Sequence, residues 1–216
     1  MIKYVFFDLD GTLTDPALGI TNSIIFALDK FGISVSDRIS LYKFIGPPLY
    51  DSFVKYYGLS HDDANLAIKY YREYFAPKGL YENTVYEGIE DCLSNLNARG
   101  LKLILATSKP EQFAREILIH FGLDKYFYDI VGATMDETRN TKGAVIAYAI
   151  HKCGIDPTFA VMVGDRMHDI DGAKLNSIKS IGVLYGFGSY DELKNAGADA
   201  IVNDVSELET TLVNMI

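Results

Sequence analysis

Residues 6–15 read FFDLDGTLTD, an apolar run followed by two carboxylates two positions apart. The run Tyr4–Phe7 predicts a strand, so Asp8 and Asp10 are expected in the loop at its carboxyl end. Gly11 allows the backbone to turn there and to approach a ligand closely. Two carboxylates suit two tasks, because one can attack a substrate while the other manages the proton of a leaving oxygen. The alternative is an acidic turn without a chemical role.

The rest of the chain alternates between strand-like and helical patterns. Four further apolar runs end in polar residues, at positions 101–106, 160–163, 180–185 and 198–202. Between them, apolar residues recur at spacings of three and four, which is the helical period. The stripes are Ile89, Leu93 and Leu96, then Phe113, Ile117 and Phe121, then Val145 and Ala149. This alternation predicts an α/β fold, a Rossmann-like parallel sheet with helices on both faces.

One interval breaks the alternation. Residues 16–80 contain helical stripes (Ile24, Leu28 and Phe31, then Leu66, Tyr70 and Tyr74) and no convincing strand. The segment Gly46-Pro47-Pro48 divides the interval, since proline cannot continue a helix. We therefore expect a core domain of residues 1–15 and 81–216, and a small all-helical cap domain of residues 16–80. A cap in this position would lie over the carboxyl edge of the sheet, where open α/β sheets bind ligands.

Composition narrows the possible classes of protein. The 216 residues are 49% apolar and carry a net charge of −9, which is typical of a packed protein and unsuited to general nucleic-acid binding. No run approaches the length of a membrane span, and we expect neither a signal peptide nor membrane attachment. Cys92 and Cys153 are isolated, which predicts two reduced thiols and a cytoplasmic protein. An anionic substrate would need local positive charge from a metal or lysines.

Three further segments carry candidate site residues. The strand-like run before Thr107, Ser108 and Lys109 would deliver a hydroxyl to its carboxyl end, although a strand-end threonine is often structural. Lys142 precedes a predicted helix, where the alternative is a solvated surface group. Residues 161–169 read VMVGDRMHD, in which Asp165 and Asp169 lie four apart just past a strand. That spacing places both carboxylates on one face of the next turn.

Taken in series, these four segments resemble the motifs of the haloacid dehalogenase superfamily. DLDGTLTD resembles the first motif, the strand ending at Thr107 the second, Lys142 the third and GDRMHD the fourth. The resemblance covers positions 8 to 169 in the family's order, and the helical insertion matches the subfamily with a cap between the first two motifs. The segment DETRNTKG around Lys142 departs from the proline-containing version that is common in the family.

The resemblance implies a mechanism and a cofactor. It implies that Asp8 is the nucleophile, that Asp10 is the acid/base, and that Thr107 and Lys142 hold the phosphoryl group. It also implies a Mg²⁺ ion bound by the side chain of Asp8, the backbone carbonyl of Asp10 and the side chain of Asp165, with Asp169 nearby. Mg²⁺ prefers hard oxygen ligands of this kind. The expected enzyme is a phosphoric monoester hydrolase that passes through an aspartyl-phosphate.

The same resemblance leaves the substrate open among small phosphorylated metabolites. Asp10 argues against a dehalogenase, which has no leaving oxygen to protonate. A phosphoglucomutase-type mutase and a catalytically retired binding module remain as alternatives. The overall pattern is similar to phosphoglycolate phosphatases and to bacterial 5′-nucleotidases. The resemblance favours the nucleotidases through the FIGPPL turn, the DETRNTKG stretch and the SKP after Thr107.

Substrate binding is expected at two places. One is the catalytic loops, through Gly11, Ser108 and Lys109. The other is the cap turn, through Lys43 and Gly46, although this turn could equally be a simple connection between helices. The many aromatic residues of the cap could stack on a nucleobase, but their spacing at i and i+4 favours burial within a helical bundle.

Overall fold

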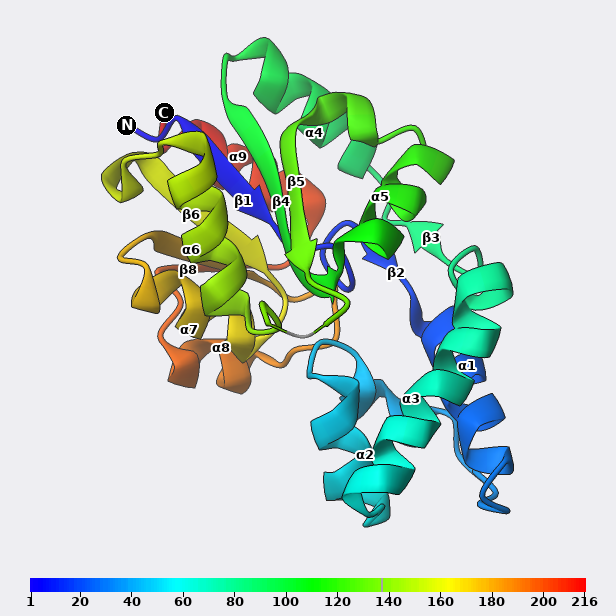
Figure 1. Cartoon of the computed structure of the whole chain (residues 1–216). Helices are drawn as coiled ribbons and strands as arrows, with labels where there is room; N and C mark the ends of the chain where they lie inside the picture. Colours follow the sequence, from blue (N-terminus) through cyan, green and yellow to red (C-terminus); the bar gives the residue numbers. More distant parts are fainter. Residues whose placement is uncertain (137) are drawn as a thin grey trace. The chain divides into compact units, whose positions relative to one another are not determined.

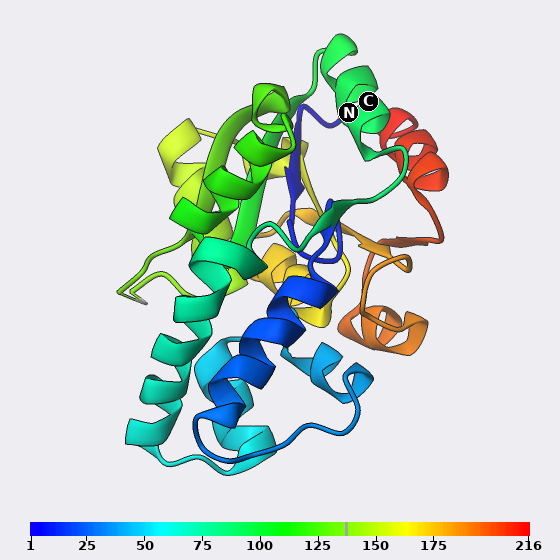
Figure 2. The same cartoon turned by 90° about the vertical axis from the view of Figure 1, so that its right-hand side faces the viewer.

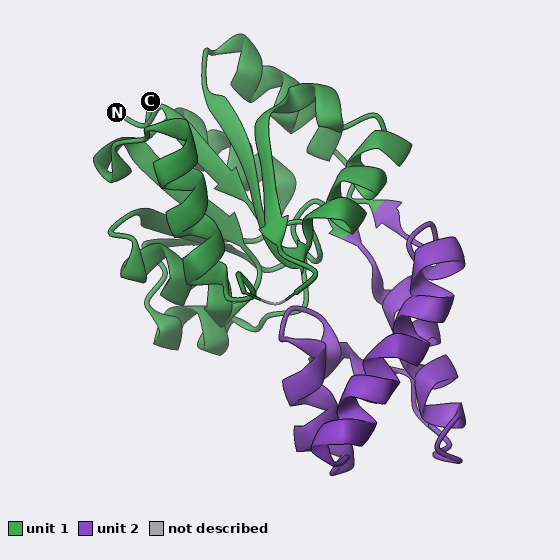
Figure 3. Ribbon diagram, viewed as in Figure 1, with its two compact units in different colours: residues 1–14, 85–216 green, residues 15–84 purple. Residues whose placement is uncertain are grey.

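A computed structural model describes residues 1–136 and 138–216; position 137, in the DETRNTKG segment, lies outside the described residues. The chain forms two compact units, one of residues 1–14 and 85–216 and one of residues 15–84, shown in green and purple in Figure 3. The sequence had suggested divisions after residues 15 and 80. Two short paired strands, β2 (Thr14–Asp15) and β3 (Thr84–Val85), lie where the chain passes between the units.

The larger unit is built on a six-stranded parallel sheet with the strand order β5-β4-β1-β6-β7-β8 (Figure 1). Its central strands are near-continuous apolar runs, as expected of parallel strands buried on both faces. The strands are β1 (Tyr4–Phe7), β4 (Lys102–Pro110), β5 (Phe127–Ala133), β6 (Ala160–Gly164), β7 (Lys179–Val183) and β8 (Ala200–Val202). The predicted Rossmann-like parallel sheet is confirmed.

Helices cover both faces of this sheet (Figures 1 and 2). On one face, α6 and α7 enclose a core that includes Phe6, Ile104 and Met162. The other face carries α4 and α9, which pack against each other, and α5. The helices are α4 (Ile89–Ala98), α5 (Glu111–His120), α6 (Lys142–Cys153), α7 (Met167–Leu175), α8 (Tyr190–Ala196) and α9 (Val205–Val213).

Strand β5 is absent from the runs identified in the sequence. It is the edge strand beside β4, and only its last four residues, Ile130–Ala133, are buried. Its first half contains the exposed Tyr128 and the charged Asp129. An edge strand contacts the core along only part of its length, so its sequence lacks the unbroken apolar run that identifies a central strand.

The smaller unit is helical between its two terminal strand segments. Its elements are α1 (Ala17–Asp29), the 3₁₀ helix η1 (Ile39–Phe44), α2 (Leu49–Tyr57), α3 (His61–Tyr74) and the π-helix η2 (Phe75–Gly79). Gly46 lies between η1 and α2 with a φ of +103°, a conformation that favours glycine. Helix α2 begins directly after Pro48, whose ring sets the extended entry to the helix.

The predicted apolar stripe of α3 is wrong by one position. Leu66 is exposed, and the buried face is Ala64, Ala67, Ile68 and Tyr71. The aromatic residues nevertheless pack within the unit: the ring of Tyr71 stacks on Phe75, with centroids 5.2 Å apart. Tyr70 and Tyr74, at the border of the buried face, meet aromatic partners on other parts of the unit, Phe31 and Phe26. These contacts support the interpretation of the aromatic residues as core.

Candidate active site

The carboxyl ends of β1, β4 and β6 bring three candidate site segments together. These strands are neighbours and run parallel, so the residues that follow them meet at one edge of the sheet. Asp8 follows β1, Thr107 lies on the last part of β4, and Asp165 follows β6. All three are buried. Residues separated by up to 157 positions therefore share one site.

Three carboxylates form the centre of the site. Asp8, Asp165 and Asp169 each place an oxygen within 4.8 Å of the other two. Asp169 is held by the start of α7, where its Oδ2 accepts a hydrogen bond of 3.1 Å from the backbone N–H of Arg166. Asp165 is held by a loop after β7, where its Oδ2 accepts a bond of 2.8 Å from the backbone N–H of Phe187. Backbone donors thus fix the direction of two of the three carboxylates.

Lys142, the first residue of α6, supplies positive charge to this cluster. Its Nζ lies 2.6 Å from Asp8 Oδ1 and 2.8 Å from Asp169 Oδ1, and it donates a hydrogen bond of 3.1 Å to the carbonyl of Ala106. The side chain is 3% exposed. Burial acts to lower the pKa of Lys142, but the charges of Asp169 and Asp8 raise it above its ordinary value, so the ammonium stays charged.

The carboxylates carry more negative charge than Lys142 balances. Burial, together with Asp169 and Asp8, raises the pKa of Asp165 well above its ordinary value. Burial also raises the pKa of Asp169 to about 6, against the lowering effect of Lys142. Buried carboxylates with raised pKa values are typical of sites that bind a cation or perform chemistry.

The cluster fits a hard divalent cation. Oδ1 of Asp165 is buried and has no hydrogen-bond donor among the described residues. Three carboxylate oxygens within reach of one point are the ligand type that Mg²⁺ prefers, and Mg²⁺ completes its shell with water and substrate oxygens. The donor set therefore suits Mg²⁺ better than a soft metal, which would need sulfur or nitrogen ligands.

Asp10 and Lys109 form a second charged pair beside the cluster. The Nζ of Lys109 lies 2.7 Å from each oxygen of Asp10, and the two side chains are 6% and 13% exposed. Burial raises the pKa of Asp10 above its ordinary value, although the charge of Lys109 acts in the opposite direction. The backbone N–H of Lys109 also donates to Oγ1 of Thr107 at 3.2 Å, which leaves the hydroxyl proton of Thr107 available to another acceptor. Ser108 is half-buried between them.

Gly11 allows the loop after β1 to approach the cluster. Its φ is +83°, and a Cβ added there would lie 2.2 Å from Oδ2 of Asp165. Any side chain at this position would displace Asp165. The need for glycine predicted from the sequence thus has a specific cause, the close approach of the backbone to a carboxylate of the cluster.

The cap residues Lys43 and Gly46 belong to the smaller unit. Lys43 is exposed, and its ammonium lies 4.3 Å from the ring centroid of Tyr56. Their assignment to substrate binding stays a prediction. Sequence reasoning missed Phe187, which contributes a backbone N–H to the site. The signal near it is weak, a Gly-Phe-Gly sequence at 186–188 after an apolar run.

Comparison with known proteins gives a consistent result. The family model for haloacid dehalogenase-like hydrolases matches residues 5–183. A 5′-nucleotidase of Pseudomonas aeruginosa is 48% identical over 190 residues, which are 88% of this chain and 86% of that protein. A tyrosine-protein kinase of Mycobacterium tuberculosis, PtkA, is 37% identical over 212 residues, which are 97% of this chain and 72% of that protein. The crystal structure of a predicted phosphatase from Clostridium acetobutylicum is 52% identical and superimposes with a TM-score of 0.97, covering 99% of each chain.

Proposed function

Because the chain belongs to the haloacid dehalogenase-like hydrolase family and is a phosphoric monoester hydrolase, we propose that it hydrolyses 5′-nucleotides with Mg²⁺ through an aspartyl-phosphate on Asp8. The observation that carries the proposal is the contact of Lys142 with Asp8 at the centre of the carboxylate cluster. The contact places a cation beside a buried carboxylate, an arrangement that suits a carboxylate nucleophile. The choice of 5′-nucleotides rests on the similarity to the Pseudomonas aeruginosa enzyme.

Each residue has a role in the proposed first step. Lys142 engages Oδ1 of Asp8, which leaves Oδ2 to attack the phosphorus. The bond from phosphorus to the leaving alkoxide breaks as the bond to Asp8 forms, and Asp10 gives its proton to the leaving oxygen. The hydroxyl of Thr107 donates to an oxygen of the phosphoryl group, and Lys142 compensates its charge. Burial raises the pKa of Asp10, a direction that favours donation of a proton to the leaving oxygen.

The second step restores the enzyme. Asp10, now ionised, takes a proton from a water molecule that attacks the phosphorus, and the bond to Asp8 breaks. Inorganic phosphate leaves, and Asp10 is again protonated. Asp8, Asp165 and Asp169 would hold Mg²⁺, with the Asp10 carbonyl as the further ligand expected from the sequence, and the ion would neutralise phosphoryl charge when bound.

No helix in the described part of the chain has the length and apolar character needed to cross a lipid bilayer. The chain as a whole is acidic, which bears on how an anionic substrate is bound. The net charge of −9 disfavours long-range attraction of polyanions, so charge compensation must come from the site itself. Lys142 and Lys109 are the buried lysines that bring such charge to the catalytic loops.

The test is phosphate release from a panel of 5′-nucleoside monophosphates, phosphoglycolate and sugar phosphates, with Mg²⁺ and with EDTA. We expect Mg²⁺-dependent turnover, highest with a 5′-nucleotide, and no turnover in the variant Asp8→Asn. If phosphoglycolate were the best substrate, the assignment to 5′-nucleotides would be wrong, but the assignment to phosphate-ester hydrolysis would stand. Inactivity of the folded wild-type protein across the panel would contradict hydrolysis and favour the mutase or the retired binding module.

A further inference from the structure

Glu111 and Arg139 form an ion pair that no step of the proposed mechanism uses. Arg139 places an amino nitrogen 3.3 Å from Oε2 of Glu111, and its Nε donates a hydrogen bond of 3.0 Å to the carbonyl of Gly132. The same Oε2 accepts a bond of 3.3 Å from the backbone N–H of Gly132. The side chain of Arg139 is 17% exposed and that of Glu111 is 29% exposed, so water screens this pair less than an ordinary surface pair.

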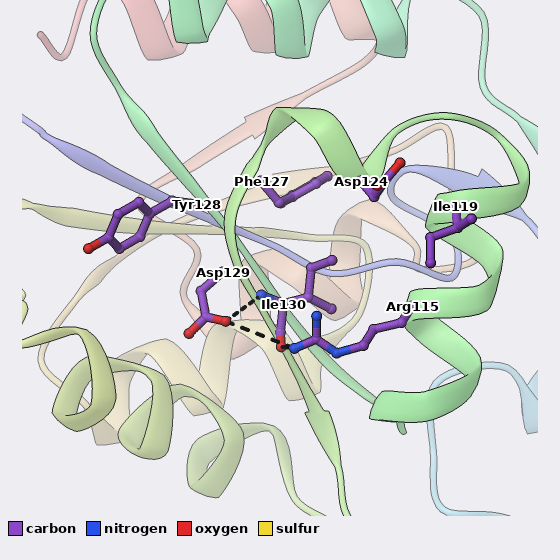
Figure 4. Close-up of a pocket in the computed structure, with 7 residues that line it drawn as sticks. All are labelled: Arg115, Ile119, Asp124, Phe127, Tyr128, Asp129 and Ile130. Atoms are coloured by element: carbon purple, nitrogen blue, oxygen red, sulfur yellow. Dashed lines mark hydrogen bonds and ion pairs between the residues drawn. The ribbon is translucent and has the colours of Figure 1, made fainter.

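Each end of the pair is secured by a second contact. The guanidinium of Arg139 lies 3.9 Å from the ring centroid of Tyr148 on α6, a cation–π arrangement. The other oxygen of Glu111 is 3.0 Å from Arg115 one turn along α5. Arg115 in turn donates to the carbonyl of Ile130 and lines a pocket of about 280 Å³ along β5, where Figure 4 shows its guanidinium against Ile130 and Asp129.

The backbone around the pair is packed too closely to shift freely. A Cβ added to Gly132 would lie 2.6 Å from Cα of Glu111 and 2.7 Å from the carbonyl oxygen of Lys109. The end of β5 therefore lies directly against the segment that leaves β4. The side chain of Glu111 also accepts a hydrogen bond from the N–H of Gly132, so its direction is linked to the close backbone packing between Gly132 and Glu111.

The pair connects the two segments that carry the cationic and hydroxyl groups of the site. Glu111 opens α5, four residues after Thr107 and two after Lys109. Arg139 lies three residues before Lys142, in the segment that departs from the proline-containing version of the family. Within the described residues, the Glu111–Arg139 ion pair is a direct side-chain link between these two segments. A proline would restrict this loop covalently, whereas here the restriction is made by side chains.

We propose that Glu111 and Arg139 are positioning residues that hold Lys142 and Thr107 in register for phosphoryl transfer. The proposal rests on the roles given above to Lys142 and Thr107. Neither Glu111 nor Arg139 would touch the substrate. Loss of the pair would let the loop before Lys142 move relative to the end of β4, and small displacements of a catalytic group lower the rate of the chemical step. Substrate binding, followed by KM, would change less than kcat.

The experiment measures kcat and KM for p-nitrophenyl phosphate with saturating Mg²⁺ in Arg139→Gln, Glu111→Gln and the double variant. We expect each single variant to lose about ten-fold in kcat with KM within two-fold, and the double variant to lose no more than the worse single one, because both changes break the same contact. Arg139→Lys keeps the charge but not the planar fork, and we expect it to recover only part of kcat. The matched control is Lys125→Gln, which breaks an exposed ion pair with Glu90 just before β5.

Melting temperature and circular dichroism of each variant separate positioning from folding. If Arg139→Gln does not fold, Arg139→Lys and Glu111→Gln carry the test. Additive losses, a rise in KM alone, or kcat within two-fold of wild type in folded variants would each overturn the proposal. A wild-type protein and control without activity would instead contradict the proposed hydrolase function, so the two failures are distinguishable.

Discussion

The ammonium of Lys142 lies 2.6 Å from Oδ1 of Asp8, although the two residues are 134 positions apart in the sequence. Lys142 opens α6, whose N-cap Thr141 accepts a hydrogen bond from the N–H of Ala144. Asp8 follows the last residue of β1. The fold thus brings a lysine at the start of one helix to a carboxylate at the end of the central strand, and this contact defines the site.

Replacement of Lys142 by Met should impair both activity and stability. We expect kcat to fall by about 10²- to 10³-fold, since the proposed role of Lys142 is to compensate charge on the phosphoryl group. Without the ammonium, Asp8 and Asp169 lose their shared partner, so the metal-free protein should lose about 3 kcal/mol of stability. Steady-state kinetics and urea unfolding with EDTA measure the two effects. An unchanged kcat in the folded variant would contradict the role of Lys142.

Replacement of Asp165 by Asn should have opposite effects on activity and on stability. Removing one charge from three close carboxylates relieves their repulsion, and the amide oxygen can still accept the bond from Phe187. We expect the metal-free variant to be more stable by about 1 kcal/mol, which raises Tm by roughly 3 °C. Mg²⁺-dependent turnover should be lost. Thermal unfolding with EDTA and then with Mg²⁺ tests this, and wild-type response to Mg²⁺ in the variant would refute the metal assignment.

Asp129 gives a pH dependence of stability away from the active site. Burial acts to raise its pKa, but hydrogen bonds from Lys152, Cys153 and the N–H of Ile130 lower it below its ordinary value. A lowered pKa in the folded state stabilises the fold above the unfolded pKa of about 4. This contribution is lost as the pH falls through the folded value.

The corresponding variant is Asp129→Asn. Because Asp129 is only partly buried and its partner Lys152 is exposed to solvent, we expect wild type to exceed the variant by only about 0.5 kcal/mol at pH 7. The difference should be smaller at pH 3, below the unfolded pKa of about 4, because protonation of Asp129 removes the charge that distinguishes it from Asn. Urea unfolding at the two pH values measures it. A difference that grows as the pH falls would show that the sign of the pKa shift is wrong.

The sequence predicted the parts of the fold that depend on short, continuous patterns. The five named strand regions hold strands because the four central strands contain continuous apolar runs and the edge strand β8 is itself a short apolar run. Strand β5 was missed because Tyr128 and Asp129 interrupt its apolar character at the edge of the sheet. The stripe on α3 was misplaced because Leu66 faces solvent while Ala64 and Ala67, which are small, form the buried face.

The side chains of the candidate site were predictable from the sequence, whereas its backbone groups were not. Asp8, Lys142, Asp165 and Asp169 come together in the structure, and each lies in a segment whose spacing the sequence displays. The N–H of Phe187 and the carbonyl of Ala106 are backbone groups, which any residue could supply, so no residue type marks them. The contact of Glu111 with Arg139 depends on tertiary packing and has no local signature.

The central claim is that Asp8 forms the covalent phosphoryl intermediate, and chemical trapping tests it most directly. Wild-type protein with Mg²⁺ is mixed with a 5′-nucleoside monophosphate, quenched in acid during turnover and reduced with borohydride, which converts an acyl-phosphate of aspartate to homoserine. Mass spectrometry then locates the modified residue. We predict homoserine at position 8 and none in Asp8→Asn. Homoserine at Asp10 or Asp165, or steady turnover with no modification at position 8, would contradict the account.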